Sequence, residues 1–78
     1  MQLFMITYEV SFKQEKQVLK VTDKMVVLHR SSKSAQSFFL ETVERAGTLL
    51  MKYNSDTRIM VPIRALDGTV VVTECVKL

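Results

Sequence analysis

Residues 6–13 read ITYEVSFK, and this stretch decides the fold because apolar and polar side chains alternate along it without a break. A period of two places one set of side chains on each face of a strand, so the pattern predicts a half-buried β-strand. The polar segment 14–17 follows, and a valine-rich segment spans 18–30. We expect a β-hairpin whose return strand is bent or bulged at the polar pair Asp23 and Lys24.

An α-helix is predicted after this hairpin. The serine-rich segment 31–34 offers hydroxyl groups that can accept hydrogen bonds from the free N–H groups at a helix start. Apolar residues then recur three and four positions apart, as on one face of a helix, at Ala35, Phe39, Val43 and Ala46. Gly47 is suited to end the helix in the left-handed conformation.

Strand patterns return after the helix, at 48–53 and 57–66. The dipeptide Asp67-Gly68 tolerates the positive φ angles of a type I′ turn, so it predicts a tight hairpin that places Ile63 opposite Val72. The resulting order is β-β-α-β-β-β, which indicates an α+β fold. We expect one α-helix and a mainly antiparallel five-stranded sheet, either open or curled into a partial barrel. A chain of 78 residues has room for one such domain, spanning 1–78.

The predicted helix is too small to cover such a sheet. A helix of about 12 residues is ~18 Å long and ~10 Å wide, and strands lie ~4.8 Å apart, so it covers two or three strands. Apolar residues on the uncovered face are then exposed, and 47% of the chain is apolar. We predict a partner-binding patch formed by Leu50, Met60, Val71 and Cys75. Closure into a partial barrel would bury these residues instead.

Basic residues are concentrated in one part of the chain. The formal net charge is +3, whereas residues 13–33 carry six basic and two acidic residues, or 6 − 2 = +4. A single basic region at one end of the domain can contact nucleic acid or an acidic protein surface. The same composition suits a solvated hairpin whose lysines protect an edge strand. The candidate residues are Lys13, Lys16, Lys20, Lys24, Arg30 and Lys33.

Stacking on nucleic-acid bases has less support in the sequence. Sheets that bind single strands expose aromatic residues between basic ones, and here we expect only Phe4 and Tyr53 to be exposed. The predicted helix carries Glu41 and Glu44 on its polar side, which disfavours its contact with DNA. Any contact with nucleic acid is therefore expected to involve the phosphate backbone.

The sequence contains no set of residues that predicts catalysis, metal binding or a cofactor. His29 is the only histidine and Cys75 the only cysteine. A zinc site takes at least three protein ligands, and the two glycines, Gly47 and Gly68, are not arranged as a phosphate-binding loop. We expect a protein that is not an enzyme and that holds neither a metal nor a cofactor.

Composition also predicts the compartment. A single cysteine cannot form an internal disulfide and is typical of a reducing environment, so we expect a soluble, cytoplasmic protein. No apolar run approaches the ~18 residues that cross a bilayer, and the first ten residues lack a basic, signal-like start. We expect no membrane contact.

These observations favour a non-catalytic protein-binding module. We expect a small regulator or inhibitor that occupies a surface of a larger protein and forms a homodimer. Proteins that handle nucleic acid are among the candidate partners. The alternative is a protein that binds nucleic acid without sequence specificity through the basic 13–33 region. A third class, an assembly subunit that pairs through strand edges, is also compatible with the sequence.

Overall fold

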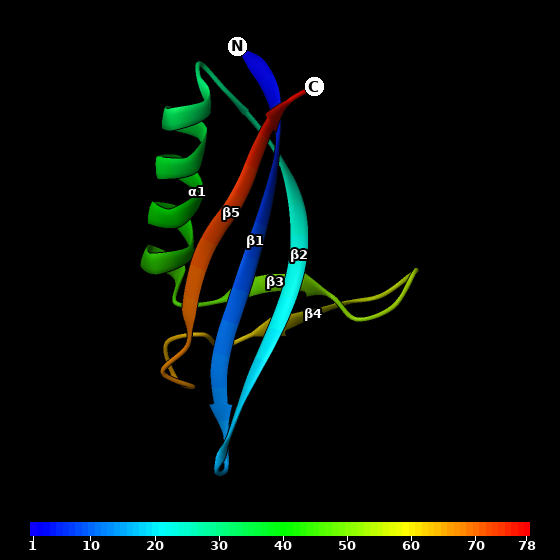
Figure 1. Ribbon diagram of the computed structural model, residues 1–78, viewed down its shortest axis with the longest axis vertical. Helices are drawn as coiled ribbons and strands as arrows, with labels where there is room; N and C mark the ends of the chain where they lie inside the picture. Colours follow the sequence, from blue (N-terminus) through cyan, green and yellow to red (C-terminus); the bar gives the residue numbers. More distant parts are fainter.

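The computed structural model describes all of residues 1–78 and contains one helix and five strands (Figure 1). The order β-β-α-β-β-β and the α+β class are confirmed. The elements are β1 (Gln2–Gln14), β2 (Gln17–His29), α1 (Ser32–Ala46), β3 (Leu49–Lys52), β4 (Arg58–Val61) and β5 (Thr69–Lys77).

The predicted first hairpin is confirmed, and it is longer than the alternation alone indicates. β1 and β2 pair in an unbroken antiparallel register from Gln2↔His29 to Gln14↔Gln17. The prediction of a bulge at Asp23 and Lys24 is wrong. The register shift lies instead between β1 and β5, at Thr7 and Tyr8, where β5 contains one extra residue.

The prediction of a single five-stranded sheet is also wrong. β2, β1 and β5 form a three-stranded antiparallel sheet in that order, and β3 and β4 form a separate two-stranded sheet. β4 ends at Val61, directly before Pro62, which has no N–H group to donate to a ladder. β5 pairs with β1 and not with β4.

The segment between β4 and β5 explains this difference. Asp67 does adopt a positive φ of 51°, but the chain before it forms a helical turn instead of a strand. The N–H of Gly68 donates to the carbonyl of Ile63 and the N–H of Asp67 to the carbonyl of Arg64, which is the hydrogen-bond pattern of a Schellman motif. The predicted pairing of Ile63 with Val72 is absent because the same left-handed residue ends a helical turn here.

The helix prediction is confirmed at both ends. The Ser31 hydroxyl accepts a hydrogen bond from the N–H of Ser34, and the Ser34 hydroxyl accepts one from the N–H of Ser31. Gly47 has a φ of 67° and its N–H donates to the carbonyl of Val43. The Arg64 guanidinium donates to the carbonyl of Glu44, so a positive charge lies at the carbonyl end of the helix, where it is favourable.

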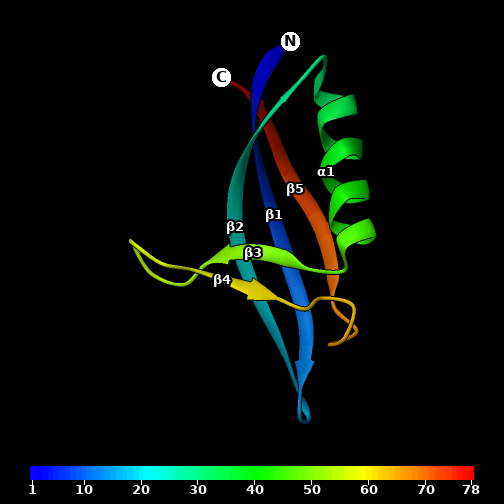
Figure 2. The ribbon, with the colours of Figure 1, turned by 180° about the vertical axis from the view of Figure 1, so that it is seen from behind.

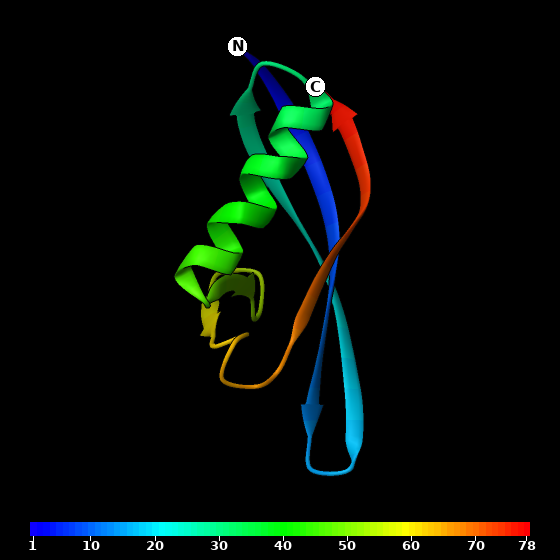
Figure 3. The ribbon, with the colours of Figure 1, turned by 90° about the vertical axis from the view of Figure 1, so that its left-hand side faces the viewer.

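Helix α1 and the β3–β4 hairpin lie on the same face of the three-stranded sheet (Figures 2 and 3). The core between them contains Ile6, Tyr8, Val10, Ala35, Phe39, Val43, Leu49, Met51 and Ile63, together with Phe4 and Val27. Both chain termini lie at one end of the molecule, and the turn between β1 and β2 lies at the other (Figure 1). The opposite face of the three-stranded sheet, called the outer face below, is covered by no other element.

Candidate binding surfaces

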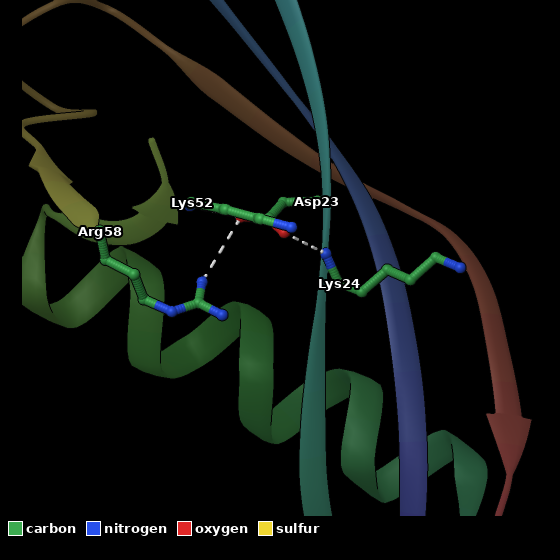
Figure 4. Close-up of polar contacts among 4 residues, drawn as sticks. All are labelled: Asp23, Lys24, Lys52 and Arg58. Atoms are coloured by element: carbon green, nitrogen blue, oxygen red, sulfur yellow. Dashed lines mark hydrogen bonds and ion pairs between the residues drawn. The ribbon is translucent and has the colours of Figure 1, made fainter. Parts of the chain in front are cut away.

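Asp23 joins the two sheets. Its carboxylate accepts hydrogen bonds from the backbone N–H groups of Lys24, at 2.7 Å, and of Lys52, at 2.8 Å (Figure 4). The Arg58 guanidinium lies 3.8 Å from the same carboxylate. Lys52 ends β3 and Arg58 begins β4, so one side chain of β2 holds both strands of the β3–β4 hairpin. The polar break in the sequence of β2 is therefore a docking point and not a bulge.

Tyr8 is the cross-strand neighbour of Asp23 on the covered face. Its ring lies 4.8 Å from that of Phe39, its side chain is fully buried, and its hydroxyl has no hydrogen-bond partner. Burial and, to a lesser extent, the Asp23 carboxylate raise the pKa of Tyr8 to about 12, against an opposing effect of Arg58. The hydroxyl stays protonated at neutral pH, so Tyr8 is not available there as a base.

Asp23 also limits the free edge of β2. β2 is an edge strand. Along it, N–H groups point alternately toward β1 and away from β1, and the two-residue turn before β2 fixes which residues do which. The N–H groups of the even-numbered residues point away from β1. The N–H of Lys24 is occupied by Asp23. The N–H groups of Val26 and Leu28 lie beyond this point and face the open edge.

An apolar groove lies beside this edge, between α1 and the β3–β4 hairpin. It encloses about 200 Å³, and nine of its eleven lining residues are apolar. Leu50 and Met60, two residues of the predicted patch, pair across β3 and β4 and both line this groove. Phe38 of α1 is 50% exposed on the helix side, although the helical pattern alone did not mark it as a binding residue. The structure thus brings Leu50 and Met60 together at a real concavity.

Val71 and Cys75, the other two residues of the predicted patch, lie elsewhere. Val71 is exposed on the outer face, opposite Glu9. Cys75 lies on the covered face, pairs with buried Ile6 and packs against the core. Side chains that are an even number of residues apart in a regular strand lie on the same face, which is why both residues were placed together. Thr73 is an extra residue between Val71 and Cys75, so these two side chains lie on opposite faces of β5. The four residues do not form one patch.

The outer face carries an apolar surface that the sequence analysis missed, here called the outer patch. Two cross-strand rows of three side chains make it up, one centred on Leu3 and one on Met5. The rows are Leu28, Leu3, Leu78 and Val26, Met5, Val76. All but Met5 are between 43% and 61% exposed. The sequence does contain an indication of this patch. Residues 3–6 and 25–28 are continuous apolar runs, and such a run gives a strand two apolar faces.

The predicted basic region is split between the two ends of the molecule. Lys16 lies in the turn between β1 and β2, and Lys13, Lys20 and Lys24 lie on the outer face of these strands. Arg30 and Lys33 lie beside the start of α1, at the opposite end (Figure 1). The expectation of one basic region at one end is therefore wrong, because a two-residue turn sends β2 back along the full length of β1.

The expected exposure of aromatic residues holds for one of the two. Tyr53 is 71% exposed, but Phe4 is buried at 3%. Phe4 occupies an even-numbered position of β1, in register with Ile6, Tyr8 and Val10, so it continues the covered face. The basic residues of the outer face consequently have no aromatic neighbours for base stacking.

His29 has one close polar neighbour that the sequence did not indicate. Its Nδ1 atom lies 2.7 Å from the hydroxyl oxygen of Ser34. That hydroxyl also contacts the Ser31 backbone and side chain, which fixes it as part of the helix cap. No group of three or more His, Cys, Asp or Glu side chains is arranged to hold a metal ion.

The only helix of the structure is too short and too polar to span a lipid bilayer. Searches against protein-family models, curated proteins and solved structures find no match to the chain.

Proposed function

We propose that this protein is a non-catalytic protein-binding module, a small regulator or inhibitor that binds an extended aliphatic segment of a larger protein in the groove beside β2. The observation that carries the proposal is the combination of an apolar groove and an unpaired strand edge on the same side of the molecule. The homodimer expected from the sequence remains part of this proposal.

The size and chemistry of the groove favour a peptide side chain over a small-molecule substrate. Ligand pockets enclose roughly 300–1,000 Å³ and place a few polar groups to orient the ligand. This groove encloses about 200 Å³ and its two polar lining residues are threonines. It therefore has room for one or two aliphatic side chains, and it lacks titratable groups that would act on a substrate.

The neighbouring edge favours an extended partner segment. An added strand pairs with the free N–H and C=O groups of an edge strand, and its alternate side chains then point to one face. A segment added to β2 at Val26 and Leu28 would direct those side chains toward Leu50 and Met60. Asp23 ends this docking site on one side because it occupies the next edge N–H group.

Charge gives the proposed partner a further property. Arg58 lies beside the end of the groove nearest to Asp23: its guanidinium is 3.8 Å from the Asp23 carboxylate, and it shares an adjoining hollow with the groove residues Met25 and Leu50. Basic residues of this kind accelerate association with an acidic surface. An acidic residue at one end of the aliphatic segment is therefore expected in the partner.

A random library of eight- to ten-residue peptides displayed on phage tests the proposal. We expect selected peptides to share aliphatic residues at alternate positions, and to shift the amide resonances of Val26 and Leu28 in NMR spectra. Met60→Glu should abolish binding. The control is Val18→Glu, because Val18 is as exposed as Met60, at 57% against 58%, but lies far from the groove. Peptides without aliphatic residues, or peptides that bind the Met60→Glu variant equally well, would contradict the proposal.

The alternative function, binding of nucleic acid without sequence specificity, rests on the basic residues alone. Lys13, Lys20 and Lys24 share one face and would contact phosphates of one duplex, whereas Arg30 and Lys33 lie at the far end. Fluorescence anisotropy with a labelled mixed-sequence duplex and single strand, at two salt concentrations, separates the two functions. Affinity for nucleic acid that falls steeply with salt would support the alternative, since each neutralised phosphate releases counterions.

A further inference from the structure

We propose that a second copy of this chain covers the outer patch, and that the two copies are related by a two-fold axis that runs close to the direction of β1. The proposed arrangement packs the outer faces of two three-stranded sheets against each other. It rests on the proposed function in that the homodimer is part of that function, and it names the surface and the geometry that form the dimer.

The charges in the row next to the outer patch indicate that the patch binds a second copy of this chain. In this row Thr7 lies at the centre, Lys24 on β2 at one edge and Glu74 on β5 at the other. The charges are opposite, and they flank a neutral centre. The row is therefore complementary to a copy of itself that is turned end to end.

A two-fold axis along β1 produces that reversal. Rotation by 180° about this axis exchanges the two edges of the sheet, so β2 of one copy lies over β5 of the other. Lys24 then faces the partner's Glu74, and Glu74 faces the partner's Lys24. The contact is isologous, as in most homodimers. Sheets packed face to face lie ~10 Å apart, which extended lysine and glutamate side chains can bridge.

The same rotation superimposes apolar rows on apolar rows. Leu28 faces the partner's Leu78, Val26 faces the partner's Val76, and Leu3 and Met5 lie near the axis. No apolar residue of the outer patch is placed opposite a charge. The apolar surface and the charged row thus support one and the same alignment.

The next row sets the limit of the contact. It has Glu9 at its centre, between Thr22 and Val71, so the rotation would place two glutamates together on the axis. Like charges in direct opposition are unfavourable. Sheets that pack with their strands aligned cross at about 30°, which places the axis about 15° from β1 and makes the two hairpins diverge beyond the Thr7 row. The interface is confined to three rows at the end of the molecule where the chain termini lie.

The area of these rows fits a weak, concentration-dependent dimer. With roughly 150–200 Å² for a fully exposed residue of this size, the outer patch exposes on the order of 450 Å² of apolar surface. The Lys24 row raises this to about 600–700 Å² for each copy, which is at the lower end of stable interfaces. We expect dissociation in the micromolar range.

Analytical ultracentrifugation of the full chain from 5 to 500 µM tests the arrangement. We expect a monomer–dimer equilibrium, and Leu28→Asp should abolish the dimer within this range. Val18→Asp is the matched control, because Val18 lies on the same strand and the same face with nearly the same exposure, 57% against 56%. Circular dichroism melting curves establish that each variant is folded.

Charge exchange tests the axis itself. Lys24→Glu should weaken the dimer at least tenfold at low salt, and the double variant Lys24→Glu/Glu74→Lys should restore it. Lys20→Glu changes the net charge equally but lies in a row with Ser11 and Thr69 and no acid, so it should leave the dimer unchanged.

A monomer at 500 µM would overturn the arrangement, and so would a dimer that Leu28→Asp does not affect. A Lys20→Glu effect as large as that of Lys24→Glu would also overturn it. Peptide binding in the groove is measured separately with a folded Val76→Asp variant, because Val76 belongs to the outer patch but lies on β5, away from the β2 edge that docks the peptide. A wild-type protein that binds peptide but stays monomeric refutes only the arrangement, and a dimeric wild-type protein that binds no peptide refutes only the proposed function.

Discussion

Replacing Tyr8 by phenylalanine should stabilise the protein, and the gain should grow at alkaline pH. The Tyr8 hydroxyl is fully buried and has no hydrogen-bond partner. A buried polar group that is left unsatisfied costs about 1–3 kcal/mol, and Tyr8→Phe removes that group without changing the ring that packs on Phe39. We expect a gain of about 1 kcal/mol in the free energy of unfolding at pH 7, or ~4–8 °C in Tm for a domain of this size.

The pH dependence follows from the raised pKa of Tyr8. Folding shifts this pKa from 10.0 to about 12, mainly because burial disfavours the phenolate. Below pH 10 both states hold the proton and the shift has no effect on stability. Above pH 10 the unfolded state releases the proton while the folded state retains it, so the wild type loses stability as the pH rises toward 12. Two pKa units correspond to about 2.7 kcal/mol, so the difference between the two proteins should widen by ~1.4 kcal/mol per pH unit in this window.

Urea unfolding at pH 7, 9, 10 and 11, followed by circular dichroism, measures this difference. Tyr53→Phe is the control, because Tyr53 is 71% exposed and its replacement should change stability little at any pH. The comparison between variants also cancels the ionisation of lysines, which they share. A Tyr8→Phe variant that is less stable than the wild type at pH 7, or a difference that is constant between pH 9 and 11, would refute the reasoning.

Three further substitutions test individual contacts by the same unfolding measurement. Asp23→Ala removes the acceptor of two backbone N–H groups, one of them on Lys52, and should cost about 2–3 kcal/mol, with faster amide hydrogen exchange in β3 and β4 than elsewhere; unchanged exchange there would contradict a docking role. Gly47→Ala places a Cβ atom at a φ of 67° and 3.0 Å from the Arg64 guanidinium, so a loss of about 1 kcal/mol is expected and a gain would be inconsistent with the cap. Glu15→Gly relieves a positive φ of 57° in the turn between β1 and β2, and should raise stability by roughly 0.5–1 kcal/mol rather than lower it.

Local patterns predicted the elements of the fold that local interactions determine. The alternation at 6–13 and the short polar segment after it are sufficient for the β1–β2 hairpin. The caps at Ser31 and Gly47 are likewise formed by residues within one helical turn of each end. In both cases the hydrogen-bond partners are close in the sequence, so the pattern contains the necessary information.

Most of the errors concern contacts between segments distant in the sequence. Asp23 interrupts an apolar strand, and considered locally this interruption indicated a bulge. Its carboxylate instead accepts a hydrogen bond from Lys52, which lies 29 residues away in the sequence. The Asp67-Gly68 dipeptide fits a hairpin and a Schellman motif equally well, and Pro62 and the pairing of β5 with β1 decide between them. The extra residue in β5 then moved Cys75 from the predicted exposed face to the core.

The two proposed surfaces lie on different faces, so both can be occupied at once. A dimer formed through the outer patch leaves the groove beside β2 open in each copy, because the groove lies on the face covered by α1 and the β3–β4 hairpin. Such a dimer presents two identical grooves. We expect its affinity for a partner with two suitably spaced aliphatic segments to exceed its affinity for a single segment by about 10²-fold or more.

This consequence separates the roles of the two surfaces in one assay. Val76→Asp, which changes the outer patch on β5 and not the β2 edge, should keep the affinity for a single peptide in solution and lose most of the additional affinity for the same peptide immobilised at high density. Met60→Glu should lose both affinities while remaining dimeric. Surface plasmon resonance at low and high peptide density measures both quantities. Equal gains from high density in the wild type and in Val76→Asp would show that dimerisation makes no contribution to binding.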